Sequence, residues 1–314
     1  MPPLVILGCT ASGKSDLAEA LAARTGATLL AVDSMQVYRG MDIGTAKPSA
    51  ETRARIPHLM IDVADPWETY SAARFAAEAR PHIAAAEKQN RPLILVGGTI
   101  LYLRALIEGL FEGPSADPAI RAALHARAHT EGSAALHKQL AAIDPAAATR
   151  IHPNDLRRIV RALEVHQLTG TPITTLQTQW SAEHPQLRAR YLGIRRDKDA
   201  LNRRINARVK TMIAAGLLDE VDRLRKDPRG FSPEAASAVG YKELLAWFAG
   251  RQTPQALDDA VEQIKIQTRH LAKMQRTWLK RWPPAPSTVH WLDAPEDAAP
   301  DALLEQALPL AGEP

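Results

Sequence analysis

The residues best suited to chemistry lie near the start of the chain. Gly8 to Ser15 read GCTASGKS, which matches G-x-x-x-x-G-K-[ST], and they separate the apolar run Leu4–Leu7 from a helical pattern that begins at Lys14. In such a loop, backbone N–H groups and the positive end of the helix bind phosphate oxygens. Lys14 adds a positive charge, and the Ser15 hydroxyl is a ligand for Mg²⁺. The sequence therefore predicts a phosphate-binding loop of the nucleotide-binding or ATP-binding kind, with Mg²⁺ as its cofactor.

Two polar residues follow other apolar runs. Asp33 comes directly after Thr28–Val32, and Thr99 comes after Leu93–Val96 and two glycines. Ligands of open parallel sheets bind at the carboxyl ends of the strands, so both residues are expected beside the phosphate loop. Asp33 acts there either as a general base or metal-water ligand, or as the cap of the turn that follows it. Thr99 is either a turn residue or a hydroxyl donor to the same ligand.

The run before Thr99 also bears on which phosphate compound is bound. P-loop NTPases usually hold Mg²⁺ with an acidic residue at the end of another strand. Leu93–Val96 is followed by Gly97, Gly98 and Thr99, with no acid. The missing acid counts against an ATPase or GTPase without excluding one, and a diphosphate that leaves during the reaction is the alternative ligand of the loop.

Short apolar runs alternate with helical patterns, and these elements must position the polar residues. The expected strands are Leu4–Leu7, Thr28–Val32, His58–Ile61, Leu93–Val96, Arg190–Ile194 and Thr288–Leu292. The expected helices are Ser15–Arg24, Ala72–Gln89, Asp117–Arg127 and Asn154–Leu168. This alternation predicts an α/β fold, a P-loop NTPase-like parallel sheet with helices on both faces.

The domain organisation follows from where the strand signals stop. Residues 114–187 carry only helical and loop patterns, so we predict a helical insertion domain there. Residues 1–113 and 188–292 then form a discontinuous core domain. Residues 293–314 are rich in alanine, proline and acids, which predicts a flexible tail.

Composition excludes several classes of protein. The 314 residues are 46% apolar and 24% charged, which is ordinary for a globular protein. No apolar run is long enough to cross a membrane, and the amino terminus lacks the basic segment of a signal peptide. The single cysteine, Cys9, excludes an internal disulfide and a multi-cysteine zinc site, and it suits the cytoplasm.

A basic helix is expected at residues 258–282. No acid occurs between Gln263 and Trp282. At about 100° per residue, five cations fall within an arc of roughly 80°, namely Lys265, Arg269, Lys273, Arg276 and Lys280. The opposite arc holds Ile264, Leu271, Met274 and Trp278, which we expect to pack on the core. An acid-free basic stripe predicts contact with nucleic-acid phosphates.

Two further groups of cations occur outside this helix. Arg150, Arg157, Arg158 and Arg161 lie in the insertion domain. The arginines and lysine between Arg188 and Arg208 are tempered by Asp197 and Asp199, so a structural role and an RNA contact are equally open for them.

Six segments occur in a characteristic order between Leu4 and Trp282: GCTASGKS, DSMQVYRGMDIGTAKP, LVGGTILYLRALIEGL, RRIVRALEVHQLTG, SAVGYKE and TRHLAKMQRTWLKRW. Together they resemble the tRNA dimethylallyltransferase (tRNA isopentenyltransferase) family of the bacterial type. The resemblance implies a prenyltransferase for tRNA modification, which moves a dimethylallyl group from dimethylallyl diphosphate to N6 of adenosine 37 beside the anticodon. Magnesium assists and diphosphate leaves. We expect a monomeric, cytoplasmic enzyme.

The resemblance also implies roles for individual residues. Asp33 would take the proton from the N6 amine, Thr99 would lie at the reaction centre, and Arg121 would steady the diphosphate. The diphosphate would be bound by Thr10, Ala11, Ser12, Gly13, Lys14 and Ser15. The residues implied to touch tRNA are Asp33, Ser34, Met35, Gln36, Arg157, Arg158, Ile159, Val160, Arg161, Ser237, Ala238, Val239, Gly240, Tyr241, Lys242, Lys273, Met274, Gln275, Arg276, Thr277, Trp278, Leu279 and Lys280. Cys9 departs from the proline that is common at its position, and its side chain is not expected to do chemistry.

Two other functions fit parts of the sequence. A small-molecule or nucleotide kinase on the same fold predicts ATP turnover, and the missing acid after Leu93–Val96 counts against it. A non-catalytic RNA-binding protein explains the basic stripe, but it does not require the complete phosphate loop.

Overall fold

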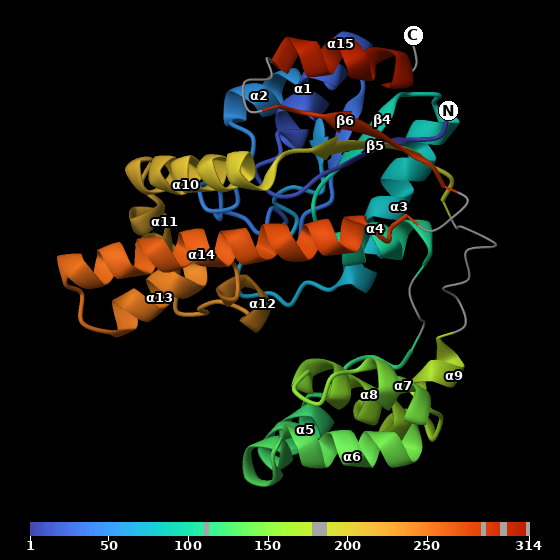
Figure 1. Cartoon of the computed structure of the whole chain (residues 1–314), viewed down its shortest axis with the longest axis vertical. Coiled ribbons are helices and arrows are strands. Elements are labelled where there is room, and N and C mark those ends of the chain that lie inside the picture. The colour runs from blue at the N-terminus through green and yellow to red at the C-terminus, as the bar shows by residue number, and fades with distance from the viewer. Residues whose placement is uncertain (110–112, 178–186, 284–286, 296–299, 312–314) are drawn as a thin grey trace. The chain divides into compact units, whose positions relative to one another are not determined.

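The computed structural model of the chain describes residues 1–109, 113–177, 187–283, 287–295 and 300–311. It divides into two compact units (Figure 1). The core unit comprises residues 1–107 and 186–314, and the helical unit comprises residues 108–185. The sequence pattern placed the corresponding boundaries at 114 and 187.

The core unit is built on one six-stranded sheet. Its strands are β1 (Leu4–Leu7), β2 (Thr28–Ala31), β3 (His58–Leu59), β4 (Leu93–Val96), β5 (Arg190–Arg195) and β6 (Val289–Asp293). Their order is β3-β2-β4-β1-β5-β6, and every pair is parallel. The predicted α/β parallel sheet is confirmed, and β1, β2 and β4 bring their carboxyl ends together at one edge.

The helices of the core unit begin and end at recognisable signals. They are α1 (Lys14–Thr25), α2 (Ala50–Arg55), α3 (Ala72–Lys88), α4 (Ile100–Ile107), α10 (Lys198–Ala214), α11 (Leu217–Arg225), α12 (Pro233–Ala236), α13 (Tyr241–Ala249), α14 (Pro254–Leu279) and α15 (Pro300–Ala311). Gly26 ends α1 in a left-handed conformation, and the Ser71 hydroxyl caps α3 by accepting from the Arg74 N–H. No helix in the described ranges has the length and apolar character needed to cross a lipid bilayer.

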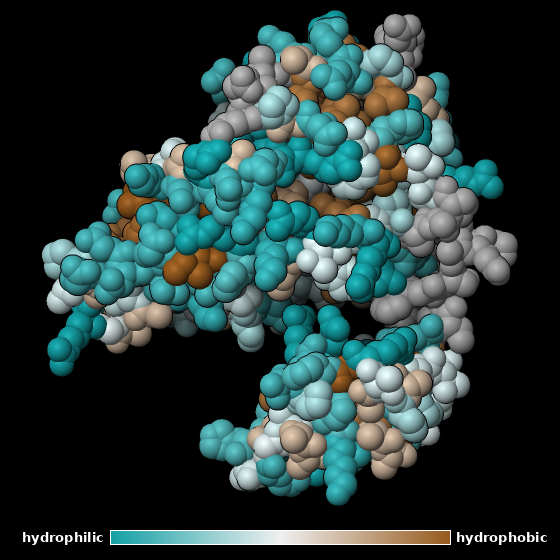
Figure 2. All heavy atoms as spheres, viewed as in Figure 1, coloured by the Kyte–Doolittle hydropathy of each residue, from teal (hydrophilic) through white to brown (hydrophobic). Residues whose placement is uncertain are grey.

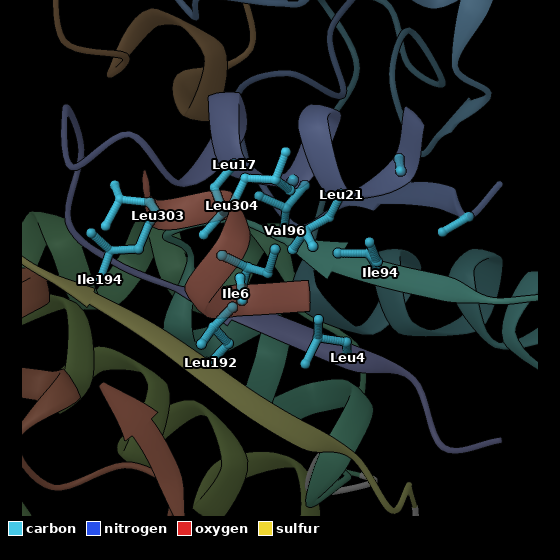
Figure 3. Packing of buried hydrophobic residues seen from close by; sticks show 14 of the residues in the cluster. Leu4, Ile6, Leu17, Leu21, Ile94, Val96, Leu192, Ile194, Leu303 and Leu304 are labelled. Carbon is cyan, nitrogen blue, oxygen red and sulfur yellow. The ribbon is translucent and has the colours of Figure 1, made fainter. Parts of the chain in front are cut away.

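Successive side chains of β1 point to opposite faces of the sheet, so they belong to two separate parts of the core. Leu4 and Ile6 face a cluster that includes Leu17 and Leu21 of α1 (Figure 3). Val5 and Leu7 are also fully buried and belong to the opposite face. Because both faces are covered, β1 is apolar at every position, as expected for a parallel sheet.

The carboxyl-terminal segment corrects the sequence-based prediction of a flexible tail at 293–314. Residues 296–299 and 312–314 lie outside the described residues, but α15 forms a helix whose Leu303, Leu304 and Ala307 are buried in the α1 cluster (Figure 3). Arg190 donates to the carbonyl oxygens of Leu310 and Ala311, at 2.9 and 3.0 Å. The apolar spacing 303, 304, 307 is a helical stripe that the neighbouring acids and prolines obscured.

We expect Leu304→Ala to lower the free energy of unfolding by about 2–4 kcal/mol, because it removes a buried side chain and leaves a cavity. Denaturant unfolding of the full chain measures this. Gln306→Ala, at an exposed position of the same helix, is the control and should stay within about 0.5 kcal/mol of wild type. Equal stability of the Leu304→Ala variant and wild type would mean that α15 does not pack stably in solution.

The helical unit has its own core. Its helices are α5 (Pro118–Glu131), α6 (Ser133–Ile143), α7 (Pro145–Arg150), α8 (Leu156–Thr169) and α9 (Ile173–Leu176). The buried residues include Leu124, Leu136, Leu140 and Leu163. Asp117 caps α5 by accepting from the N–H groups of residues 119 and 120, which explains why the helix begins at Pro118.

Candidate active site

The phosphate loop joins β1 to α1 in a strained conformation. Ala11 and Gly13 have φ angles of +61° and +95°, and α1 begins without a side-chain cap. Its first N–H groups are therefore available to an anion. The Ser12 hydroxyl is buried and has no hydrogen-bond partner among the described residues. A buried hydroxyl without a protein partner in a loop of this form is suited to bind a polar group such as a phosphate oxygen.

Two arginines hold the loop by its carbonyl oxygens. Arg196 Nε donates to the Ser12 carbonyl at 2.8 Å, and Arg204 Nε donates to the Ala11 carbonyl at 2.9 Å. Elsewhere in the same basic group, Arg195 pairs with Asp293 at 3.0 Å. These contacts support the structural interpretation for these three arginines.

Lys14 and Arg208 provide the positive charge of the site. Burial lowers the pKa of Lys14, while the negative charge of Asp33 opposes this shift and Arg208 adds to it. Burial also lowers the pKa of Arg208, again opposed by Asp33. The two cations and the carboxylate therefore interact within one site. Sequence reasoning missed Arg208 as a site residue, although its position four residues after Arg204 places both on one face of α10.

Asp33 and Thr99 are joined through the backbone after β2. Asp33 Oδ1 accepts from the N–H groups of Met35 and Gln36, at 2.8 and 3.3 Å, so it does cap the turn. Its Oδ2 accepts no hydrogen bond from the residues that the structure describes. Thr99 Oγ1 accepts from the Ser34 N–H at 3.0 Å. One carboxylate oxygen thus anchors the turn while the other is left for chemistry.

The Gly97 position explains why no acid follows β4. A Cβ atom there would collide with the Val32 carbonyl, because the ends of β2 and β4 approach closely. Thr99, two residues later, is the first position with room for a functional side chain, and its N–H donates to the same Val32 carbonyl at 3.4 Å.

A buried carboxylate organises the loop GMDIGTAKP. Glu220 of α11 accepts from the N–H groups of residues 42, 43 and 44, at 2.9, 2.9 and 3.2 Å, and from the Tyr241 hydroxyl. Burial and the charge of Glu220 raise the pKa of Tyr241 far above its ordinary value. Gln36 Nε2 donates to the Thr45 and Ala46 carbonyls at 3.2 Å. The loop therefore braces the segment that carries Asp33.

Arg121 belongs to the helical unit, where it forms a bidentate pair with Glu164 at 2.9 and 3.0 Å. Arg161 donates to the same carboxylate at 2.7 Å. Burial acts to raise the pKa of Glu164, but the two arginines and the Asp117 N–H outweigh it and hold the pKa below its ordinary value. The network orients Arg121, whose action on the diphosphate stays a prediction.

We expect Glu164→Gln to lower the free energy of unfolding of the helical unit by about 1–3 kcal/mol at pH 7, allowing for the partly exposed arginines. Since the folded-state pKa is depressed, this contribution is complete above the unfolded-state pKa of about 4.3 and is lost as the pH falls through the folded-state value. In unfolding curves from pH 7 to pH 3, the difference in stability between the variant and wild type should therefore become smaller below about pH 4.3. A constant difference across that range would contradict the assignment.

The orientation of α14 differs from the prediction. Met274 and Trp278 are 57% and 44% exposed, whereas Ile264, Ala272 and Leu279 are buried. The buried side is therefore rotated by roughly 80° toward the basic arc, at about 100° per residue. The helix has this orientation because the polar side chain of Gln275 faces the phosphate loop and is hydrogen-bonded to it. A pattern of apolar residues cannot reveal such a polar contact.

Ion pairs within α14 shorten the free part of the basic stripe. Lys265 and Arg269 both pair with Glu262, at 3.0 and 3.4 Å. Lys273, Arg276 and Lys280 have no acidic partner among the described residues. The surface of the core unit over α14 is mainly hydrophilic in the view of Figure 2.

The structure sorts the predicted tRNA-binding residues by exposure. Nine are exposed: Arg157, Arg158, Ser237, Lys242, Lys273, Met274, Thr277, Trp278 and Lys280. Eight are half-buried: Asp33, Ser34, Met35, Gln36, Arg161, Val239, Gln275 and Arg276. Six are buried: Ile159, Val160, Ala238, Gly240, Tyr241 and Leu279. The buried six pack inside their own units, and the tRNA contact of the whole set stays a prediction.

A cavity of about 320 Å³ adjoins the phosphate loop. Cys9 and Ser12 line it together with one apolar residue from each of β5, β6, α10 and α14 and with the cations Arg195, Arg196, Arg276 and Lys280. Burial raises the pKa of the Cys9 thiol, which keeps it neutral. The lining therefore combines apolar side chains with cations, and the absence of a chemical role for Cys9 stays a prediction. No group of three or more metal-binding side chains occurs within the described ranges.

The fold and the site define an α/β protein with a phosphate-loop motif beside a basic helix. Comparison with known proteins gives the family. The model of the IPP transferase family matches residues 36–282. The tRNA dimethylallyltransferase of Geobacter metallireducens is 46% identical over 292 residues, covering 93% of this chain and 92% of that protein.

Solved structures of similar proteins agree with this family assignment. The tRNA isopentenylpyrophosphate transferase of Bacillus halodurans is 37% identical with a TM-score of 0.69, and the match covers 99% of this chain and 95% of that one. A eukaryotic dimethylallyltransferase described as acting on tRNA gives 27% identity and a TM-score of 0.77, over 99% of this chain and 80% of that one. The chain belongs to the IPP transferase family, that of the tRNA dimethylallyltransferases.

Proposed function

We propose that this transferase moves a dimethylallyl group from dimethylallyl diphosphate to N6 of adenosine 37 in tRNA and releases diphosphate. The observation that carries the proposal is the meeting, at the ends of β1, β2 and β4, of an uncapped phosphate loop with Asp33, whose Oδ2 is open. Membership of the family supports a prenyl donor and a tRNA acceptor.

The chain's own groups suit both halves of this reaction. An allylic diphosphate ionises readily when charge on the departing diphosphate is stabilised, and the loop N–H groups, Lys14 and Arg208 are placed to do this. The exocyclic amine of adenine is a weak nucleophile, so a base is needed as the N–C bond forms. Asp33 takes the N6 proton on Oδ2, while Oδ1 stays bound to the turn.

The donor set of the loop fits Mg²⁺. Ser15 presents an exposed hydroxyl at the start of α1, and hydroxyl and phosphate oxygens are ligands that this ion prefers. Ser15 would hold Mg²⁺, which would supply further neutralisation of the diphosphate charge. We place Arg121 on the diphosphate, the basic residues of the helical unit and of α14 on tRNA, and the enzyme in the cytoplasm as a monomer.

The kinase alternative is disfavoured by the end of β4. The close approach of Gly97 to Val32 leaves no room for the acidic side chain that many P-loop NTPases use for Mg²⁺.

The test is mass spectrometry of nucleosides from unmodified tRNA incubated with the protein, Mg²⁺ and dimethylallyl diphosphate. One dimethylallyl group should be gained on adenosine, and ATP should not replace the donor. ATP consumption without this gain would favour the kinase. If neither dimethylallyl transfer nor ATP consumption were observed, the remaining interpretation would be a non-catalytic RNA-binding protein.

For tRNA binding, we expect Lys273→Ala and Lys280→Ala each to weaken affinity and to reduce the slope of log affinity against log salt by about one. Both lysines are exposed and lack acidic partners within the described ranges. Binding titrations from low to high salt measure the slope. Lys265→Ala is the matched control, since that lysine is already paired with Glu262 and should leave the slope unchanged. If the slope of log affinity against log salt were unchanged in all three variants, α14 would have a purely structural role.

A further inference from the structure

Gln275 joins the two halves of the active site through its side-chain amide. Its Oε1 accepts from the Thr10 N–H in the phosphate loop, at 2.8 Å. Its Nε2 donates to the Gly98 carbonyl in the turn after β4, at 3.0 Å. These partners lie 265 and 177 residues away along the chain, so one side chain bridges two separate loops.

The fit at Gly98 is tight. A Cβ atom there would collide with the Gln275 amide, so the amide would have to move away from the turn if residue 98 were not glycine. Thr99, the next residue, is bound in turn to Ser34 beside Asp33. The bridge therefore runs from the donor site at Thr10 to the residues that face the acceptor.

The position of Gln275 on α14 also matters. Lys273 and Arg276, its neighbours on the helix, are cations without acidic partners in the described part of the chain. Sequence resemblance groups Gln275 with the residues that touch tRNA, yet both ends of its amide are occupied by backbone groups of the active site.

We propose that Gln275 is a positioning residue for the transfer reaction, which sets the spacing between the phosphate loop and the turn that carries Thr99. This inference rests on the proposed function. A small displacement of reacting groups costs up to about 10²-fold in rate, so the bridge acts on kcat rather than on tRNA affinity.

The experiment compares Gln275→Met, Gly98→Ala and the Gly98→Ala/Gln275→Ala double variant. Methionine has a similar size but makes neither hydrogen bond, and the alanine at 98 displaces the amide. We expect kcat at saturating donor and tRNA to fall about 10–100-fold in each single variant, with tRNA affinity within about twofold of wild type. The double variant should be no slower than Gly98→Ala, because the bridge is already lost and the collision is relieved.

Gln263→Ala on the exposed side of the same helix is the control, and its kcat should match wild type. Melting curves show whether each variant is folded, and either single variant suffices for the comparison of kcat with tRNA affinity. Unchanged kcat with weakened tRNA binding would overturn the proposal and make Gln275 a tRNA contact, and additive losses in the double variant would also overturn it. A wild-type protein that forms no dimethylallyladenosine would instead refute the proposed function itself.

Discussion

Asp33→Asn is expected to lower kcat for prenyl transfer by about 10²–10⁴-fold while tRNA still binds with wild-type affinity. Asparagine keeps an Oδ1 that accepts from the Met35 and Gln36 N–H groups, so the turn after β2 is preserved. Its amide nitrogen replaces Oδ2 and cannot take a proton. Single-turnover assays at saturating tRNA, together with a binding titration, measure the two effects separately.

A second substitution distinguishes the two roles of Asp33, as the cap of the turn and as the general base. Asp33→Ala removes both oxygens, so it should lose the activity and also destabilise the turn, which a lower melting temperature reports. Asp33→Asn should melt close to wild type. If Asp33→Asn retained activity within tenfold of wild type, the carboxylate would serve only as a cap, and another group would take the N6 proton.

The elements of this fold that could be predicted from the sequence are those whose structure is determined by residues close to them along the chain. β1, β2 and β4 are short apolar runs bounded by glycine, proline or aspartate, and their limits follow the pattern within a residue or two. The phosphate loop could be recognised locally, because its glycines, Lys14 and Ser15 lie within eight residues, whereas the two arginines from a distant part of the chain that hold its carbonyl oxygens could not. Asp33 and Thr99 could be placed beside it because the carboxyl ends of parallel strands meet at one edge.

The rest depends on contacts between distant residues. The loop that begins at Gly40 has no interpretation until Glu220, almost 180 residues later, accepts its N–H groups. The orientation of α14 follows from Gln275, a polar residue on the buried side that periodicity assigns to neither face. Helix α15 was missed because acids and prolines around Leu303 and Leu304 dilute a short apolar stripe.

Lys14→Met is expected to lower kcat/KM for dimethylallyl diphosphate by about 10²–10³-fold, since the ammonium group stabilises charge that develops on the departing diphosphate. The same substitution should not lower the stability of the free protein. Burial lowers the pKa of Lys14, so the charged form is less favourable in the folded than in the unfolded chain. Below its folded-state pKa the lysine therefore costs folding free energy, and wild-type stability rises as the pH increases through that value.

Replacing the ammonium by an apolar side chain removes this cost, so the melting temperature of Lys14→Met at neutral pH should equal or exceed that of wild type while transfer is lost. Melting curves and steady-state kinetics on the same preparations test both halves. Lys88→Met, at an exposed position on α3, is the control and should change neither quantity. If the Lys14→Met variant had both a lower melting temperature and a lower activity, the loss of activity would follow from lost stability, and Lys14 would be a structural residue. Lost activity in a protein of undiminished stability would mean that the phosphate loop keeps a destabilising buried charge because catalysis needs it.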